Sequence, residues 1–324
     1  MFSIEEYRNA FLAHMKLRIQ ESEPKNLYEP ITYILGLGGK RLRPILTLMA
    51  ADMFANDHKD ALDAALAIEV FHNFSLVHDD IMDEAPLRRG NPSVHKKWNI
   101  NSGILSGDAM LIMAYQLLEG YGPGLHHKLS HLFGKTALQV CEGQQMYMDF
   151  ETQEKVPLSR YMTMIEYKTA VLLATALQMG ALVGRASEKD QQSLYDFGRN
   201  LGLAFQLQDD YLDAFGDPIT FGKQVGGDII ENKKTYLYIT ALEKGSEPQK
   251  KELLALFSSK PKNPAKKVDR VLDLYHSTGA SELIKSEIKT YTLNAFDTLE
   301  ALNIPPEKKE GIHSLGRNLM GRAQ

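Results

Sequence analysis

The sequence predicts an all-α fold. Apolar residues recur three and four positions apart through most of the chain, which is the spacing of one face of an α-helix. Alternation of apolar and polar residues between hairpin turns, which is typical of half-buried strands, is hard to find. Short groups of glycine and proline interrupt the periodic segments, as expected of loops between packed helices. Together these observations favour a bundle of about ten helices.

The expected helices follow one another along the whole chain. The periodic segments cover 4–19, 61–76, 104–118, 138–148, 161–183, 194–212 and 271–302. The uncharged run 169–184 contains Thr175, Gln178 and Gly180, and it falls short of the ~18 apolar residues of a spanning helix. We therefore expect a buried helix there and no membrane span. Residues 1–324 are expected to form a single domain.

Composition places the chain among ordinary globular proteins. Hydrophobic residues make up 44% and charged residues 24%, which excludes disordered and collagen-like classes. The 37 Lys and Arg against 41 Asp and Glu give a net charge of -4, so the chain has no global attraction for nucleic acid or anionic membranes. Cys141 is the only cysteine, which excludes an internal disulfide and a cysteine zinc site. With no signal peptide recognisable at the N-terminus, a cytoplasmic location is expected.

Two aspartate-rich pentads share one spacing. They are DDIMD at 79–83 and DDYLD at 209–213, whereas 19 aspartates in 324 positions would produce the pattern about 0.06 times by chance. On a helix, the first and last aspartates of each pentad lie on one face, where like charges repel unless a cation separates them. Apolar residues precede both pentads, which disfavours surface acids without a role. Carboxylate oxygens of this kind predict Mg²⁺ bridged to substrate phosphates.

Basic groups accompany both pentads. GGKRLRP at 38–44 and LRRG at 87–90 flank the first, and Lys223 and the segments GGD at 226–228 and KKT at 233–235 follow the second. Arginine suits bidentate phosphate contacts, and lysine suits point-charge contacts. Taken singly, each group is typical of a solvated surface. Their position beside acidic helix ends favours diphosphate binding.

These segments together resemble the trans-isoprenyl diphosphate synthases, the polyprenyl synthetase family. The resemblance rests on GGKRLRP, HNFSLVHDDIMD with LRRG, and GLAFQLQDDYLD with GKQVGGD and NKKT, and it spans at least 38–235. It implies an isoprenoid synthase bundle around a central cavity. The implied partners of the chain are a second copy of itself and two substrates. The implied enzyme is a Mg²⁺-dependent prenyltransferase that condenses isopentenyl diphosphate with dimethylallyl, geranyl or farnesyl diphosphate. The implied product is short, geranylgeranyl or farnesyl diphosphate.

The resemblance also assigns roles to single residues. The implied ligands of about three Mg²⁺ ions are Asp79, Asp80, Asp83, Asp209, Asp210 and Asp213. The residues matching positions on the allylic diphosphate are Arg88, Lys168 with Thr169, Lys223 and Lys233. All the pentad aspartates except Asp213 are expected to be catalytic, together with Lys168 and Lys223.

Other matched positions concern the second substrate and the isoprenoid chain. Those implied to hold isopentenyl diphosphate are Lys40, Arg43, His72 and Arg89. Phe205 and Gln206 match positions beside the isoprenoid chain, and Phe74 and Ser75 match positions whose bulk sets product length. On pattern alone, His72 would be a core histidine, and only the resemblance gives it a binding role.

One position departs from the family pattern and leaves product length open. Three residues past Gln144, short-chain members usually carry an aspartate, where this chain has Tyr147. Asp149 does not replace that aspartate, because two residues along a helix turn the side chain by about 200°. A longer polyprenyl product is therefore an alternative to the short one.

Two further alternatives use the same motifs. A class I terpene cyclase would not need Lys40, Arg43 and Arg89, because it takes no second diphosphate. A non-catalytic subunit of another synthase would be expected to have degraded pentads, and both are intact. The condensing enzyme is the interpretation that uses all the motifs.

Overall fold

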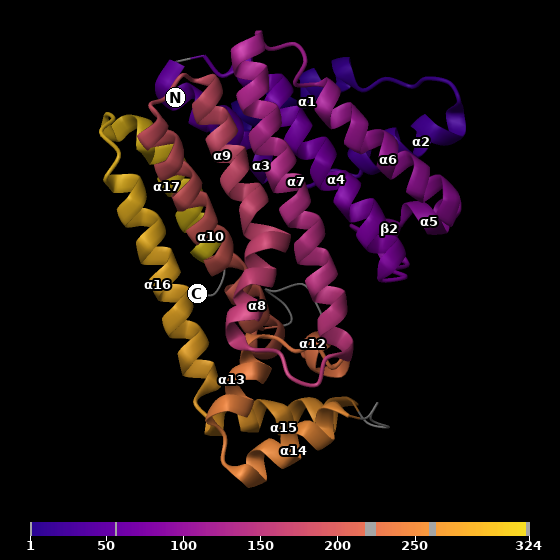
Figure 1. The fold of residues 1–324 in the computed structure, drawn as a ribbon, viewed down its shortest axis with the longest axis vertical. Helices are drawn as coiled ribbons and strands as arrows, with labels where there is room; N and C mark the ends of the chain where they lie inside the picture. Colours follow the sequence, from indigo (N-terminus) through magenta and orange to yellow (C-terminus); the bar gives the residue numbers. More distant parts are fainter. Residues whose placement is uncertain (1, 56, 218–224, 259–263, 322–324) are drawn as a thin grey trace. The chain divides into compact units, whose positions relative to one another are not determined.

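The computed structural model describes residues 2–55, 57–217, 225–258 and 264–321, and these residues are almost all helical (Figure 1). The chain divides into two compact units. The first consists of Met1–Ala137, Thr175–Tyr195 and Leu302–Ile312, and the second of Leu138–Ala174, Asp196–Ala301 and His313–Gln324. The predicted all-α fold is confirmed. None of the described helices has both the length and the apolar character needed to cross a bilayer.

The first unit is organised around one buried helix. Its elements are α1 (Ile4–Arg18), α2 (Lys25–Gly36), α3 (Leu42–Ala55), the 3₁₀ turn η1 (Lys59–Ala61), α4 (Leu62–Met82), α5 (Val94–Lys97) and α6 (Ile100–Gln116). Helix α4 packs against α3 and α6 and also contacts α1 and α2. Its sequence is apolar on nearly all sides, which is typical of a helix covered by neighbours. The first pentad ends this helix.

A small hairpin follows α4, and the sequence pattern did not predict it. Strands β1 (Leu87–Arg88) and β2 (Asn91–Pro92) pair antiparallel. The two residues between them, Arg89 and Gly90, have φ of 53° and 77°. Positive φ at both central positions is the pattern of a two-residue type I′ turn, whose twist matches that of paired strands.

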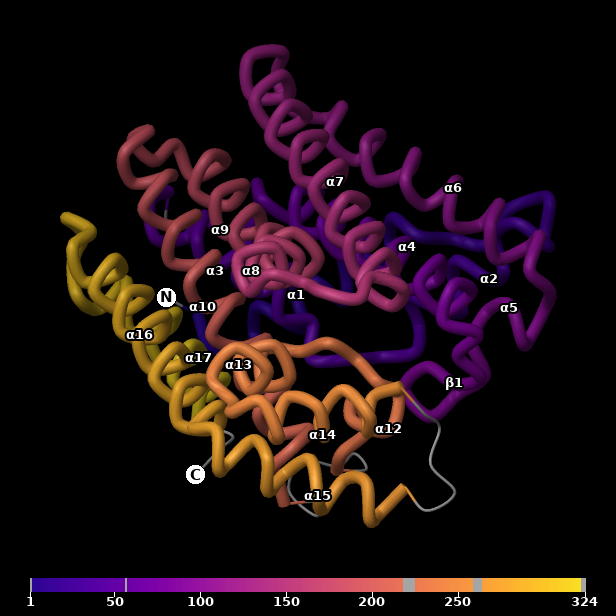
Figure 2. The backbone as a smooth tube through the Cα atoms, turned by 60° about the horizontal axis from the view of Figure 1, so that its bottom comes forward, coloured from indigo at the N-terminus to yellow at the C-terminus, as the bar shows by residue number. Residues whose placement is uncertain are grey.

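The second unit contains the second pentad and most of the remaining helices. Its elements are part of α7 (Pro123–Thr152), α8 (Leu158–Ile165), the π-helical turn η2 (Glu166–Ala170), parts of α9 (Val171–Val183), α10 (Glu188–Phe215) and α17 (Pro306–Met320), and the whole of α12 (Gly227–Ile230), α13 (Tyr236–Lys244), α14 (Glu247–Phe257), α15 (Pro264–Ser277) and α16 (Ala280–Glu300). A buried apolar cluster includes side chains from α8, α10, α13 and α15. Helix α12 lies beside α15 (Figures 1 and 2).

Two segments expected to be continuous helices are interrupted. The segment 161–183 is divided into α8, η2 and α9, because five residues around Lys168 adopt a π-helical turn. The segment 271–302 is broken between α15 and α16 at Gly279, which has φ of 78°. Glycine adopts this left-handed conformation without a Cβ penalty, so it ends a helix even where apolar periodicity continues.

Helix α9 approaches α3 closely at Gly180, which provides a test of packing in the first unit. A Cβ atom there would lie 2.1 Å from the Thr47 carbonyl oxygen and 2.9 Å from the Ala50 Cβ. We expect Gly180→Ala to lower the free energy of unfolding by about 1–3 kcal/mol, because a helix must move. Urea unfolding measures this change.

The control is Gly124→Ala near the start of α7, where a Cβ would meet nothing within 4 Å. This substitution should be neutral or stabilise by up to about 1 kcal/mol, because alanine favours helix. Equal effects of the two substitutions would contradict the close packing at Gly180.

Candidate active site

The first pentad lies at the C-terminal end of α4. Asp79 and Asp80 belong to the last turn of the helix, and Asp83 is its C-cap. The Asp83 N–H donates to the Asp79 carbonyl oxygen at 2.8 Å, so the helical turn continues through the pentad. Asp79 is half-buried and Asp83 exposed, whereas Asp80 is buried. The expected i, i+4 pair is thus formed, with Asp80 turned toward the interior.

Asp80 is held by Arg88 from the hairpin. The Arg88 Nε donates to both carboxylate oxygens at 3.1 Å, and Nη2 forms an ion pair with Oδ1. Burial lowers the pKa of Arg88, but the hydrogen bonds and charge of Asp80, with the charges of Asp79 and Asp83, outweigh it and raise the pKa. Two residues predicted for metal and diphosphate therefore bind each other.

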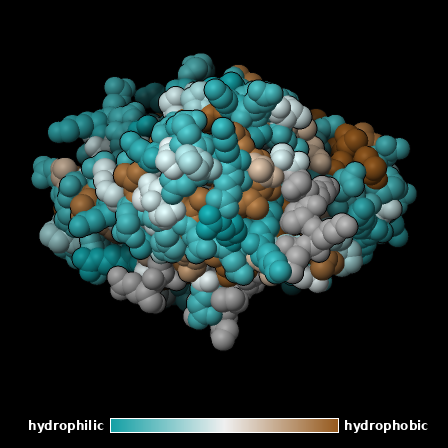
Figure 3. All heavy atoms as spheres, turned by 90° about the horizontal axis from the view of Figure 1, so that it is seen from below, coloured by the Kyte–Doolittle hydropathy of each residue, from teal (hydrophilic) through white to brown (hydrophobic). Residues whose placement is uncertain are grey.

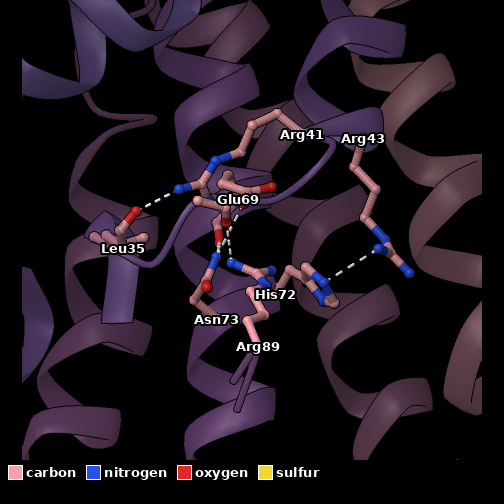
Figure 4. A network of polar contacts seen from close by, with 8 residues as sticks. Leu35, Arg41, Arg43, Glu69, His72, Asn73 and Arg89 are labelled. Atoms are coloured by element: carbon pink, nitrogen blue, oxygen red, sulfur yellow. Dashed lines mark hydrogen bonds and ion pairs between the residues drawn. The ribbon is translucent and has the colours of Figure 1, made fainter. Parts of the chain in front are cut away.

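A buried ion pair supports the basic segment that precedes α3. Arg41, with φ of 51°, pairs with Glu69 of α4 and donates to the Leu35 carbonyl oxygen (Figure 4). Glu69 also accepts a hydrogen bond from the Asn73 amide at 3.1 Å. Both charged partners are almost fully buried, so removing either one would leave an uncompensated buried charge. This pair fixes the start of α3 beside α4.

Arg43 and His72 lie together next to this pair (Figure 4). The Arg43 Nη1 is 3.2 Å from the His72 Nε2. Because a guanidinium can only donate, Nε2 accepts and the His72 proton is on Nδ1. Burial lowers the pKa of His72 well below its usual value, and the charges of Arg43, Arg89, Arg88 and Arg41 lower it further. His72 is therefore neutral at pH 7 in a strongly positive environment.

Arg89 completes this basic group. It occupies the turn of the hairpin, and its Nη1 donates to the Gly38 carbonyl oxygen. A Cβ at Gly39 would lie 3.0 Å from the guanidinium carbon, so the glycine pair leaves room for this side chain. Burial lowers the pKa of Arg89, and nearby arginines add to the effect. The structure thus brings Arg43, His72 and Arg89 together, and Lys40 is exposed in the segment before α3.

The second pentad lies near the C-terminal end of α10. The middle one of its three aspartates, Asp210, is buried and accepts hydrogen bonds from the Tyr161 hydroxyl and, at 3.3 Å, from the Gln206 amide. The Gln206 oxygen in turn accepts from the Thr169 hydroxyl at 3.2 Å. Burial raises the pKa of Asp210 to about 8, and the charge of Asp228 contributes to the rise. In the absence of a cation, Asp210 is therefore largely protonated at neutral pH.

The last aspartate of this pentad is held by the start of α12. The Asp213 carboxylate accepts a hydrogen bond from the Asp228 backbone N–H at 3.0 Å. The Asp228 side chain is 3.1 Å from the Lys233 ammonium, which also pairs with Glu231 at 2.7 Å. Burial lowers the pKa of Lys233, but Asp228 and Glu231 outweigh it and raise the pKa. Asp228, to which no role was assigned from sequence, therefore links the pentad to Lys233.

Lys168 and Thr169 lie in the π-helical turn η2. Such turns occur frequently at functional sites, because the extra residue alters which side chains face a neighbour. Phe205 and Gln206 lie on α10 in the turn before the second pentad, and both are half-buried. Lys223 lies outside the residues that the structure describes.

The two positions assigned to product length are on α4, in the turn before the first pentad. Phe74 is 8% exposed, and its ring centroid lies 5.4 Å from that of Phe71 and 4.8 Å from that of His78. The Ser75 hydroxyl donates to the His72 carbonyl oxygen at 2.9 Å. Phe74 thus supplies the bulk at this position and Ser75 supplies little.

Two further polar residues were given no role from the sequence. Tyr161 holds Asp210 but is 49 residues away from it, and nothing local distinguishes it from a core tyrosine. The Lys234 ammonium donates to the carbonyl oxygens of Phe150, Glu151 and Gln153 at 2.7, 3.1 and 2.5 Å. Lys234 therefore caps the C-terminal end of α7. Its position beside Lys233 is the only signal that the sequence contains.

No three histidine, cysteine, aspartate or glutamate side chains in the described parts of the chain are grouped so as to hold a metal ion. The six pentad aspartates therefore remain predicted ligands.

A family model described as polyprenyl synthetase matches residues 24–275. The chain belongs to the polyprenyl synthetase family. It is 36% identical over 314 residues to geranylgeranyl diphosphate synthase of Methanosarcina mazei, covering 95% of this chain and 94% of that protein. A crystal structure of a geranylgeranyl pyrophosphate synthase matches with a TM-score of 0.95 and 50% identity over 100% of both chains. The predicted family and trans-prenyltransferase class are confirmed, and these relatives support synthesis of a short-chain prenyl diphosphate.

A third relative contains ligands. The geranylgeranyl pyrophosphate synthase of Corynebacterium glutamicum, complexed with isoprenyl diphosphate and magnesium, matches the prenyltransferase with a TM-score of 0.83 and 27% identity, covering 98% of each chain.

The neutral His72 makes the stability of the prenyltransferase depend on pH. The unfolded chain binds a proton at this histidine near pH 6.5, whereas the folded chain does not, so stability is full above that pH and falls below it. We expect wild type to lose up to about 1.4 kcal/mol per pH unit relative to His72→Gln below pH 6.5. Urea unfolding at pH 7.5 and 5.5 measures the difference.

His127→Gln, at an exposed position on α7, controls for the general effect of replacing a histidine. If the free energy of unfolding changed equally in wild type and in His72→Gln between the two pH values, His72 would bind a proton in the folded protein as readily as in the unfolded chain.

Proposed function

We propose that this chain is a Mg²⁺-dependent trans-prenyltransferase that condenses isopentenyl diphosphate with an allylic diphosphate, with geranylgeranyl diphosphate as the product ahead of farnesyl diphosphate. The observation that carries the proposal is the form of the two pentads. Each presents an i, i+4 pair of carboxylates at the end of a largely buried helix and fixes its middle aspartate to the protein. Arg88 pairs with an aspartate of the first pentad, and Lys233 pairs with Asp228 beside the second pentad.

The donor set suits magnesium. Carboxylate oxygens are hard ligands, and Mg²⁺ commonly joins one or two of them to substrate phosphates. We assign Asp79 and Asp83 to one part of the metal site and Asp209 and Asp213 to the other, with about three ions in total. Asp80 and Asp210 complete the two sets of ligands, and Arg88 and Tyr161 hold their carboxylates in place. When bound, the ions supply positive charge to the leaving diphosphate.

The cations divide between two diphosphates. Arg43 and Arg89 form a positive group with the neutral His72 and with Lys40 nearby, and we assign these residues to isopentenyl diphosphate. Arg88, Thr169, Lys168 and Lys233, with Lys223, are assigned to the allylic diphosphate. Positive groups fixed before reaction stabilise the charge that develops as the diphosphate leaves.

The reaction then needs no protein nucleophile. The bond between C1 and oxygen of the allylic substrate breaks, and its electron pair leaves with the diphosphate. The alkene electrons of isopentenyl diphosphate form the new carbon–carbon bond to C1. Loss of a proton from C2 of the isopentenyl unit to the released diphosphate restores an alkene. Apolar side chains such as Phe74 and Phe205 are assigned to contacts with the isoprenoid chain. These side chains shield the allylic cation from water.

We further propose that residues 1–324 act as one catalytic domain and as a homodimer. Each unit carries one of the two pentads that the reaction needs.

The exposed face of α6 carries large apolar side chains at Ile100, Ile104, Leu105 and Ile112, within about 140° of arc. The face of the molecule in Figure 3 is mainly hydrophilic with small apolar groups. An apolar helix face of this kind fits a second copy, and sedimentation of the purified chain tests it, because a monomer at micromolar concentration would exclude this dimer.

Metal and turnover should be inseparable. We expect Asp79→Ala and Asp209→Ala each to reduce turnover about a hundredfold or more, because charge stabilisation of the leaving group is lost. The fold should be retained, because removing one carboxylate from a repelling pair does not destabilise the metal-free protein. The measurement is product formation from isopentenyl diphosphate and each allylic starter with Mg²⁺ or with EDTA.

The control is Asp297→Ala, an exposed aspartate on α16, which should retain wild-type turnover. Near-normal turnover in either pentad variant, or full activity in EDTA, would refute the proposed mechanism.

Product length should depend on Phe74. This residue lies about 7.5 Å along the helix axis from Asp79, far enough to stop a chain after a few isoprene units. Phe74→Leu and Phe74→Ala should shift the products to longer chains, with the larger shift for alanine, and Ser75→Ala should leave them unchanged. Chromatography of products at matched substrate ratios measures the shift. Active variants with an unchanged distribution would show that length is set elsewhere.

A further inference from the structure

Helix α7 meets the π-helical turn η2 through one face. A Cβ at Gly143 of α7 would lie 2.4 Å from the backbone nitrogen of Lys168, so only glycine allows this approach. Tyr147 is four residues farther along α7 and therefore lies on the same face. The residue that departs from the family pattern is thus directed to the turn that carries Lys168.

The Lys168 side chain lies over the Tyr147 ring. The ammonium nitrogen is 3.7 Å from the ring centroid, well within the range of a cation–π interaction. Tyr147 is half-buried and packs against the apolar cluster of the second unit, which holds its ring in place. Lys233 is also near. Burial lowers the pKa of Lys233, Asp228 raises it, and the Tyr147 phenol adds to the rise. Tyr147 is therefore close to two lysines assigned to the allylic diphosphate.

We propose that Tyr147 is a positioning residue that directs Lys168 to the allylic diphosphate without neutralising it. The inference rests on the proposed function, in which Lys168 binds that diphosphate. An aspartate at this position would pair with the ammonium and cancel its charge. An aromatic face orients the same ammonium through the ring quadrupole and adds no negative charge beside it. The local charge is thus one unit more positive than with aspartate.

Three substitutions separate orientation from charge. Tyr147→Phe keeps the ring, Tyr147→Leu removes it but keeps apolar volume, and Tyr147→Asp introduces the carboxylate. The probe is inorganic diphosphate with Mg²⁺, whose Kd is measured by calorimetry at fixed ionic strength. We expect the Kd to stay within about twofold in the Phe variant and to rise about three- to tenfold in the Leu variant. Tyr147→Asp should also bind more weakly than Tyr147→Phe.

Kinetics supply a readout that a merely structural role would not change. In Tyr147→Leu, the KM for the allylic diphosphate should rise while the KM for isopentenyl diphosphate stays the same. In Tyr147→Phe, both KM values should match wild type. Met146→Ala is the control, because Met146 packs against the same apolar cluster. Its Kd and KM values should match wild type. Thermal unfolding of each variant checks that the fold is retained.

The outcomes distinguish this inference from the proposed function. Wild-type affinity and KM in folded Tyr147→Leu, or the same defect in Met146→Ala, would overturn the role of Tyr147. Wild-type affinity in Tyr147→Asp would overturn the claim that a carboxylate at this position weakens diphosphate binding. A wild-type protein that binds inorganic diphosphate but makes no prenyl product from any starter would contradict the proposed function, and the calorimetry would still decide the role of Tyr147.

Discussion

The candidate site depends on holding like charges together at a helix end. Three aspartates in five residues repel one another, and the structure contains this repulsion by burying the middle one. Asp80 is fixed by Arg88 and Asp210 by Tyr161 and Gln206. With the middle carboxylate directed inward, helical geometry leaves the first and third on one other face. The hairpin after α4 matters because it carries Arg88 to Asp80. Helix α8 matters because it carries Tyr161 to Asp210.

Identical spacing conceals different electrostatics in the two pentads. The partner of Asp80 is a cation, and their mutual attraction raises the pKa of Arg88 despite its burial. The partners of Asp210 are a phenol and an amide, so burial and the charge of Asp228 raise its pKa to about 8. The first pentad is thus held by a salt bridge and the second by a neutral hydrogen-bonded chain. Partners eight and 49 residues away decide this, and the pentads themselves do not show it.

Periodicity predicted the fold and failed where backbone conformation changes without a change in side-chain pattern. A π-helical turn adds one residue to a turn, and the apolar spacing around Lys168 hardly changes, so α8, η2 and α9 were predicted as one helix. The break at Gly279 is a single left-handed residue inside a continuing apolar pattern. Strands β1 and β2 are two residues long, too short for alternation to be detected. The pentads were found because their spacing is itself the helical period.

The basic segment before α3 shows why charge alone does not identify a binding residue. Lys40, Arg41 and Arg43 lie within four residues of one another, and Arg41 is bound on both sides, by Glu69 and by the Leu35 carbonyl oxygen. It was left out of the predicted site because the resemblance did not include it, and the ion pair supplies the physical reason. Since Arg41 occupies the nearby carboxylate of Glu69, His72 lies among arginines whose charge lowers its pKa. The buried pair thereby leaves an excess of positive charge that a diphosphate can neutralise.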